Sequence, residues 1–234
     1  MALLSTLVKT IADVEGLEET QVAWVARALR EAGFIVQKGR GRGSAHMDVT
    51  SSSNLLIGLN GAANARDAVE AVMAFRSLQC LHSQARAFKD IFKLGHPFSS
   101  ALELLIEKAI PDALGMSDLA LSLMTQSDTT FSANIKDYYC ENQRKLEYLF
   151  ESSITFYRPL YQVAVDIHET GRISEDDPLP LPNPDLNEDA YERERRSIVS
   201  ATFGMPRQAR YGDRREAISI SLKTIMAVGR ILAT

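Results

Sequence analysis

Residues 17–34 read LEETQVAWVARALREAGF, and this stretch decides the N-terminal part of the fold. It begins with acidic residues, which the helix macrodipole favours at a helix N-terminus. Its apolar residues then recur at three- and four-residue spacings, at Val22, Val25, Ala26 and Leu29. That spacing predicts an amphipathic helix with one buried face, closed by Gly33. The other faces carry Thr20, Gln21, Ala23, Trp24 and Arg27.

A similar pattern precedes this helix. Within residues 3–14, one stripe of apolar side chains is formed by Leu3, Leu4, Leu7, Val8, Ile11 and Ala12. The stripe predicts an amphipathic helix, and Gly16 ends it because glycine tolerates the left-handed backbone. The sequence therefore predicts two helices joined by a short turn.

The pattern changes period after Gly33. Phe34, Ile35 and Val36 favour a strand, and Met47 and Val49 resume an extended pattern. Between them lies QKGRGRGSAH, residues 37–46, a glycine-rich turn that carries Lys38, Arg40 and Arg42. These features predict a β-hairpin with a basic tip. Two helices followed by a hairpin is the order of a winged helix-turn-helix.

The segment VAWVARALREAGFI, residues 22–35, resembles the recognition helix and the start of the wing in MarR-type and related winged-helix transcription regulators. The resemblance covers about residues 3–50. It implies a DNA-binding module whose wing tip would be Lys38, Arg40 and Arg42. Two departures stand out: the family's usual first helix is missing, and Trp24 occupies a position where the family often has a small polar or basic residue.

The residue types suit contact with a double helix. An α-helix can enter the major groove, where Gln21 could contact adenine and Arg27 could contact guanine or a phosphate. Arginines of a wing can neutralise phosphates or enter the minor groove. Between residues 27 and 42 the chain has five basic side chains and one acid, although its formal net charge is −4. Trp24 has two open interpretations, packing against another subunit or domain, and contact with a base or sugar.

The other residues predict a mixed architecture. Helices are expected at 50–61 (capped by one of Ser51 to Ser53), 64–92, 98–109 (capped by Ser99 or Ser100), 116–126 (opened by Ser117) and 219–233, and less clearly at 130–145. Alternating strands are expected at 146–151, 153–159, 162–169 and 197–203, with Pro159 between two strands and a proline-rich acidic loop at 173–189. The predicted fold class is α+β, with a winged helix-turn-helix over 1–62 and a helical plus β-meander domain over 63–234.

Composition excludes several classes of protein. The net charge of −4 argues against a generally basic nucleic-acid coat. Cys80 and Cys140 form no C-x-x-C pair, so neither a disulfide framework nor a zinc ribbon is expected. The sequence has no catalytic or metal-binding motif around its four histidines, and no enzyme activity and no cofactor are predicted. The lack of a signal peptide or of a long apolar stretch predicts a cytoplasmic protein without a membrane partner.

These observations predict a sequence-specific regulator of transcription that binds double-stranded DNA as a homodimer. The contact residues would be Thr20, Gln21, Ala23, Trp24, Arg27, Lys38, Arg40 and Arg42. Alternatives are a winged-helix replication or partition factor of a mobile element, and a module that contacts protein rather than DNA. A second arginine group, within residues 192–215, could extend the DNA footprint or pair with the acidic loop. Whether a small effector binds is left open.

Overall fold

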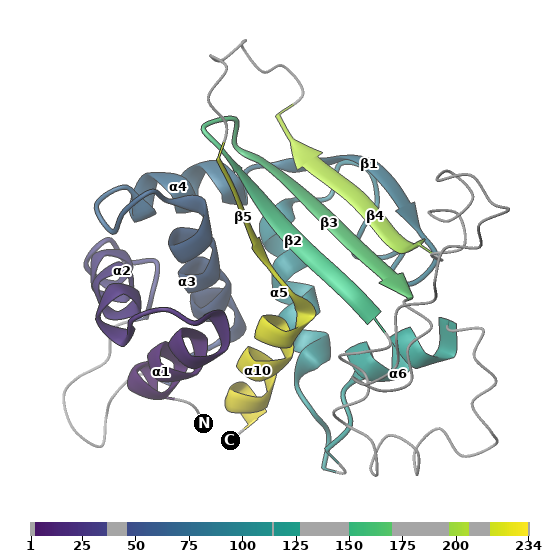
Figure 1. Ribbon diagram of the computed structural model, residues 1–234, viewed down its shortest axis with the longest axis horizontal. Helices are drawn as coiled ribbons and strands as arrows, with labels where there is room; N and C mark the ends of the chain where they lie inside the picture. Colours follow the sequence, from purple (N-terminus) through teal and green to yellow (C-terminus); the bar gives the residue numbers. More distant parts are fainter. Residues whose placement is uncertain are drawn as a thin grey trace, which may run out of the picture.

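The computed structural model describes residues 3–36, 46–113, 115–126, 150–169, 197–205 and 216–233 (Figure 1). In these ranges, seven helices accompany one five-stranded sheet with the order β1-β4-β3-β2-β5, in which every paired neighbour is antiparallel. The α+β class predicted from the sequence is confirmed. The expected helix at 130–145, the acidic loop at 173–189 and the arginines within residues 192–215 lie outside the described ranges.

The elements follow one another along the chain with helices first and most strands later. The helices are α1 (Leu4–Glu15), α2 (Glu19–Glu31), α3 (Val49–Gly61), α4 (Ala68–Arg76), α5 (Phe98–Ala109), α6 (Asp118–Gln126) and α10 (Leu222–Ala233). The strands are β1 (Gln79–Ala85), β2 (Phe150–Arg158), β3 (Gln162–Glu169), β4 (Ser197–Gly204) and β5 (Glu216–Ile220).

Helix α3 is the buried centre of the helical layer, with every side chain from Ser51 to Gly61 shielded from solvent. Its N-cap is Asp48, whose Oδ1 accepts a hydrogen bond from the backbone N–H of Ser51 at 2.7 Å. The expectation that one of the serines caps this helix is therefore wrong. The helix begins earlier than predicted, at Val49, because the aspartate satisfies the free N–H groups of its first turn.

The long helix expected over residues 64–92 does not form. Helix α4 ends at Arg76, and Gln79–Ala85 become β1, which pairs with β4. The partner strand lies more than a hundred residues away in the sequence, so local periodicity carries no trace of the pairing. Hydrogen bonds to a distant strand outweigh the local helix preference of these residues.

Helix α5 has its predicted range, and α6 begins at Asp118, two residues later than predicted. The N-cap of α5 is Pro97, with no side-chain cap, and the Ser99 hydroxyl instead donates to the carbonyl of Arg76 at 3.2 Å. The predicted serine cap of α5 is therefore wrong. Ser117 does accept a hydrogen bond from the N–H of Ala120 at 3.3 Å, as expected for the residue that opens α6.

Strands form where they are predicted at 162–169 and 197–203, and Pro159 does separate two strands, β2 and β3. The two strands expected at 146–151 and 153–159 are, over the described residues, the single strand β2. Val163, Val165 and Ile167 are buried, whereas Ala164 and Asp166 face the other side. Alternation of this kind is typical of an antiparallel sheet with one face on the core. Near the C-terminus, residues 219–220 belong to β5 rather than to the predicted helix, because Ser219 and Ile220 pair with β2.

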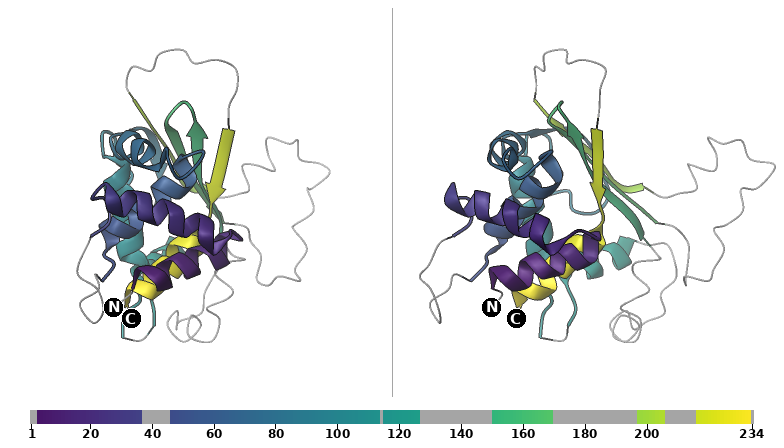
Figure 2. Two further views of the ribbon diagram at one scale, coloured as in Figure 1. Left: turned by 90° about the vertical axis from the view of Figure 1, so that its left-hand side faces the viewer. Right: turned by 60° about the vertical axis from the view of Figure 1, so that its left-hand side comes forward.

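The helices α3, α4 and α5 lie on one side of the sheet (Figure 2). Edge-to-face aromatic contacts join the two layers: the ring of Phe98 lies 5.7 Å from that of Phe156 and 5.3 Å from that of Phe203. Helix α10 packs on both α1 and α5, and at Gly229 an added Cβ would lie 2.5 Å from the carbonyl oxygen of Ala109. One continuous hydrophobic core therefore runs from α1 to α10.

Candidate functional site

The helix pair predicted from the sequence is present, and its turn is tight. Gly16 ends α1 in the left-handed region at φ 67°, and the N–H of Leu17 donates to the carbonyl of Ala12 at 2.9 Å. Helix α2 then begins at Glu19 without a side-chain cap. Helix α2 buries its whole predicted stripe. In α1 the stripe is buried from Leu7 to Ala12, whereas Leu3 is exposed and Leu4 is only partly buried. This burial packs α2 against α1 and α3.

The outward face of α2 carries three of the predicted contact residues. At about 100° per residue, Thr20, Trp24 and Arg27 lie opposite the buried stripe. Trp24 is 67% exposed, which is unusual for the largest apolar side chain in the chain. Ala23 is exposed on one flank of this face.

Arg27 has an acidic neighbour on the same face. Its Nε lies 2.7 Å from Oε1 of Glu31, one helical turn further on. The hydrogen bond to Glu31, together with its charge, raises the pKa of Arg27 above its usual value. Exposed pairs at this spacing contribute little to stability, so Arg27 can leave Glu31 at little cost.

Gln21 occupies the opposite flank, away from the outward face. It lines a cavity of ≈400 Å³ together with Glu15, Leu17 and Asn60, and with Ser219 and Thr224 from the C-terminal part of the chain. The structure therefore brings Thr20, Trp24 and Arg27 together but places Gln21 at the edge of the group.

Glu15, which lines the same cavity as Gln21, was not singled out by the sequence patterns. Burial raises its pKa to about 7, against the opposing effect of a hydrogen bond with Asn60. Its Oε1 is buried and has no hydrogen-bond partner. A signal was present in the sequence, because Glu15 continues the buried stripe four residues after Ile11 and three after Ala12.

The described residues on either side of segment 37–45 are held by α3 and by Leu3. Asn54 Nδ2 donates to the carbonyl of Phe34 at 2.8 Å, Ile35 is buried, and the N–H of Val36 donates to Ser51 Oγ at 3.5 Å. On the returning side, His46 forms an antiparallel bridge with Leu3.

The predicted hairpin is therefore wrong for the described residues flanking the loop. Residues 34–36 form no strand, and Val49 begins α3 instead of extending one. The side chains of α3 provide the hydrogen-bond partners that a second strand would have supplied. Lys38, Arg40 and Arg42 lie outside the described residues.

The described part of the chain offers little for metal or nucleophilic chemistry. It contains no group of three or more His, Cys, Asp or Glu side chains that could hold a metal ion. Cys80 is buried, its thiol donates to the carbonyl of His82 at 3.3 Å, and desolvation raises its pKa. Burial of this kind disfavours the reactive thiolate. Among the same residues, no helix is long and apolar enough to cross a bilayer.

The surface formed by Thr20, Trp24 and Arg27 lies on a helix whose opposite face is buried in the core. Comparison of the chain with protein-family models, with curated proteins and with solved structures found no match.

Proposed function

We propose that the protein is a sequence-specific regulator of transcription that binds double-stranded DNA through the outward face of α2, as a dimer. Residues 3–50 would act as a helix-turn-helix module, with Lys38, Arg40 and Arg42 as additional basic contacts. The observation that carries the proposal is the outward face itself: Thr20, Trp24 and Arg27 point to solvent from a helix whose opposite face is locked in the core.

A helix held in this way suits the major groove. An α-helix with its side chains is about 10–12 Å across, and the groove is about 12 Å wide. Thr20 would contact base edges or a phosphate, and Trp24 would lie against a base or sugar. Arg27 would exchange Glu31 for a phosphate or guanine.

The charge pattern supports the same docking. Lys38, Arg40 and Arg42 would neutralise phosphates next to the groove that α2 occupies. Two described residues that flank this segment, Phe34 and His46, are bonded to Asn54 and Leu3 respectively. A single module of this size buries little DNA surface, so two copies on a symmetric site are expected.

One observation favours a second candidate function. Glu18 and Glu19 are exposed at the N-terminus of α2, where negative charge would oppose a close approach to phosphates. Beside these acids, the exposed Trp24 is also suited to a protein contact, for which tryptophan is a favoured anchor. The alternative is an interaction module in which α2 binds protein.

The two functions separate in one binding experiment. Wild-type protein is titrated with genomic DNA fragments over a range of salt concentrations, beside the double variant Arg40→Ala/Arg42→Ala and the double variant Thr20→Ala/Trp24→Ala. Loss of two phosphate contacts should lower the log–log salt slope by roughly 2 and weaken binding to all sequences alike. Loss of the α2 contacts should reduce the preference for the selected site over random DNA. Absence of binding to any fragment at low salt would support the protein-contact function instead.

A further inference from the structure

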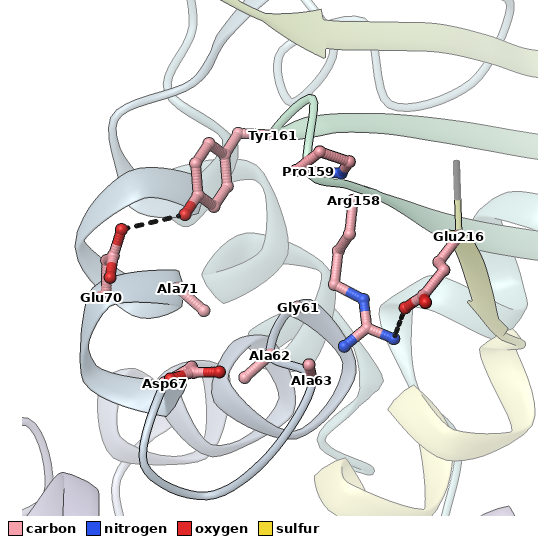
Figure 3. Close-up of a pocket in the computed structure, with 10 residues that line it drawn as sticks. All are labelled: Gly61, Ala62, Ala63, Asp67, Glu70, Ala71, Arg158, Pro159, Tyr161 and Glu216. Atoms are coloured by element: carbon pink, nitrogen blue, oxygen red, sulfur yellow. Dashed lines mark hydrogen bonds and ion pairs between the residues drawn. The ribbon is translucent and has the colours of Figure 1, made fainter. Parts of the chain in front are cut away.

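A second cavity, of ≈530 Å³, opens between the helical layer and the sheet (Figure 3). Its walls come from three distant parts of the chain: the connection from α3 to α4, the turn between β2 and β3, and the start of β5. Its volume is in the range of small-molecule sites. Ala62, Ala63 and Ala71 give it short apolar walls (Figure 3).

Arg158 is the unusual residue of this cavity. Its side chain is only 15% exposed, and its Nη2 lies 3.1 Å from Oε2 of Glu216. Its other two nitrogens, Nε and Nη1, are buried and have no hydrogen-bond partner. In Figure 3, Nη1 lies on the side of the guanidinium away from Glu216, towards Ala62 and Ala63. Buried donors without acceptors are costly, so this guanidinium is suited to receive an acceptor from a ligand.

The acidic side chains around Arg158 limit which acceptor fits. Asp67, Glu70 and Glu216 line the same cavity, so its carboxylates outnumber its one guanidinium by three to one. Glu70 accepts a hydrogen bond from the Tyr161 hydroxyl at 3.2 Å, and Asp67 accepts one from Asn64 at 2.6 Å. A phosphate or a dicarboxylate would bring more negative charge to a site that already has an excess. A ligand with one negative and one positive group matches both kinds of side chain.

The small residues that line the cavity are small for different reasons, and only some of them indicate a ligand site. At Gly61, an added Cβ would lie 2.7 Å from the ring of Phe75, so helix packing alone requires glycine there. Ala63 is exposed at the rim, where packing sets no such demand. Arg158 and the carboxylates, rather than the glycine, therefore mark this cavity as a binding site.

We propose that this cavity binds a small zwitterion with a carboxylate and an ammonium group, of the α-amino acid class. The ligand carboxylate accepts hydrogen bonds from Arg158 once the guanidinium turns towards the cavity, and the ammonium group lies against Asp67. Charge-assisted hydrogen bonds of this kind are the strong ones in proteins. The proposal does not depend on DNA binding, because occupancy of the cavity can be measured without DNA.

The test uses the full chain and the common L-α-amino acids as probes. Each is screened by its effect on the unfolding temperature, and any that raises it is titrated by calorimetry. Each binder is compared with its carboxamide, which lacks the carboxylate, and with its deamino acid, which lacks the ammonium group. At least one amino acid is expected to bind, and both comparison compounds are expected to bind roughly 10- to 100-fold more weakly.

Three variants locate the binding. Arg158→Gln and Asp67→Asn are each expected to weaken binding roughly 10-fold or more. Arg86→Gln changes an exposed arginine that does not line the cavity, and is expected to bind like the wild type. Asp67 is exposed, so its variant remains informative if Arg158→Gln fails to fold.

Several results would overturn the proposal. The first is that no amino acid raises the unfolding temperature or gives heat on titration. The second is that a binder keeps its affinity when its carboxylate or its ammonium group is removed. The third is that it binds Asp67→Asn as tightly as the wild type. Each of these results excludes a zwitterion site at Arg158, whatever the DNA experiment shows.

Discussion

The outward face of α2 and the cavity around Arg158 are built in opposite ways. Thr20, Trp24 and Arg27 come from about two turns of a single helix, and they are exposed. The cavity collects Asp67, Arg158 and Glu216 from segments up to about 150 residues apart, and its main cation is mostly buried. Periodicity along the chain can therefore predict the first surface but carries no information about the second.

The two regions share one core, and Phe75 is its common point. Its ring makes edge-to-face contacts with Phe156 and Tyr161, both at 5.4 Å, and closes against Gly61 of α3. Phe75→Ala should lower the free energy of unfolding by about 3–5 kcal/mol, because a large cavity is left behind. Chemical denaturation measures the effect. A loss below about 1 kcal/mol would show that the helical layer and the sheet do not depend on each other.

Glu15 links the helix pair to the C-terminal part of the chain and makes stability depend on pH. Its pKa rises from 4.5 to about 7 on folding, so the folded protein keeps the proton to higher pH than the unfolded chain. Stability should therefore fall as the pH rises from about 4.5 to about 7, by up to about 3 kcal/mol, and change little above it.

Glu15→Gln isolates this contribution. Unfolding free energies of the variant and the wild type, measured across the same pH range, should diverge in favour of the variant as the pH rises. A difference that is constant with pH would show that Glu15 titrates normally and that the cavity beside Gln21 is open to water.

Gly16 sets the angle between α1 and α2 through its left-handed backbone at φ 67°. Nothing lies within 4 Å of the place that a Cβ would occupy, so only backbone strain opposes a side chain. Gly16→Ala should cost about 1 kcal/mol. Thermal unfolding measures it, with the exposed helical substitution Asp13→Ala as the control that should change little. Equal unfolding temperatures of the two variants would mean that the turn accepts alanine without backbone strain.

Trp24→Ala should have the smallest effect on stability, within about 0.5 kcal/mol, because the side chain is exposed. The same substitution should reduce whatever binding α2 performs. Denaturation and binding measured on one preparation separate the two quantities. A stability loss well above 1 kcal/mol would indicate that Trp24 packs within the protein rather than serving a partner.

The parts of the fold with strong local periodicity were predictable. The stripe of α2, most of the stripe of α1, the range of α5 and the alternation of β3 appear in the structure as predicted. Prediction failed where distant partners decide the outcome: residues 79–85 became β1 because β4 pairs with them, and Asp48 replaced the expected serine cap of α3.

Side chains that act through burial were the hardest to predict. Glu15 and Arg158 look like ordinary charged residues in the sequence, and only the segments that close over them make them unusual. Gln21 was expected to contact a partner but lines a cavity instead. Helical spacing cannot tell which flank of α2 will share a cavity with β5 and α10. Local patterns therefore predict exposure better than they predict surroundings.

The proposed role of α2 is tested most directly by competition between a selected DNA site and random DNA. Equilibrium binding is measured for the wild type and for Thr20→Ala/Trp24→Ala, with unfolding curves to confirm that both are folded. The account predicts that the wild type prefers the selected site and that the double variant loses most of this preference while it still binds random DNA. An unchanged preference in the double variant would contradict it.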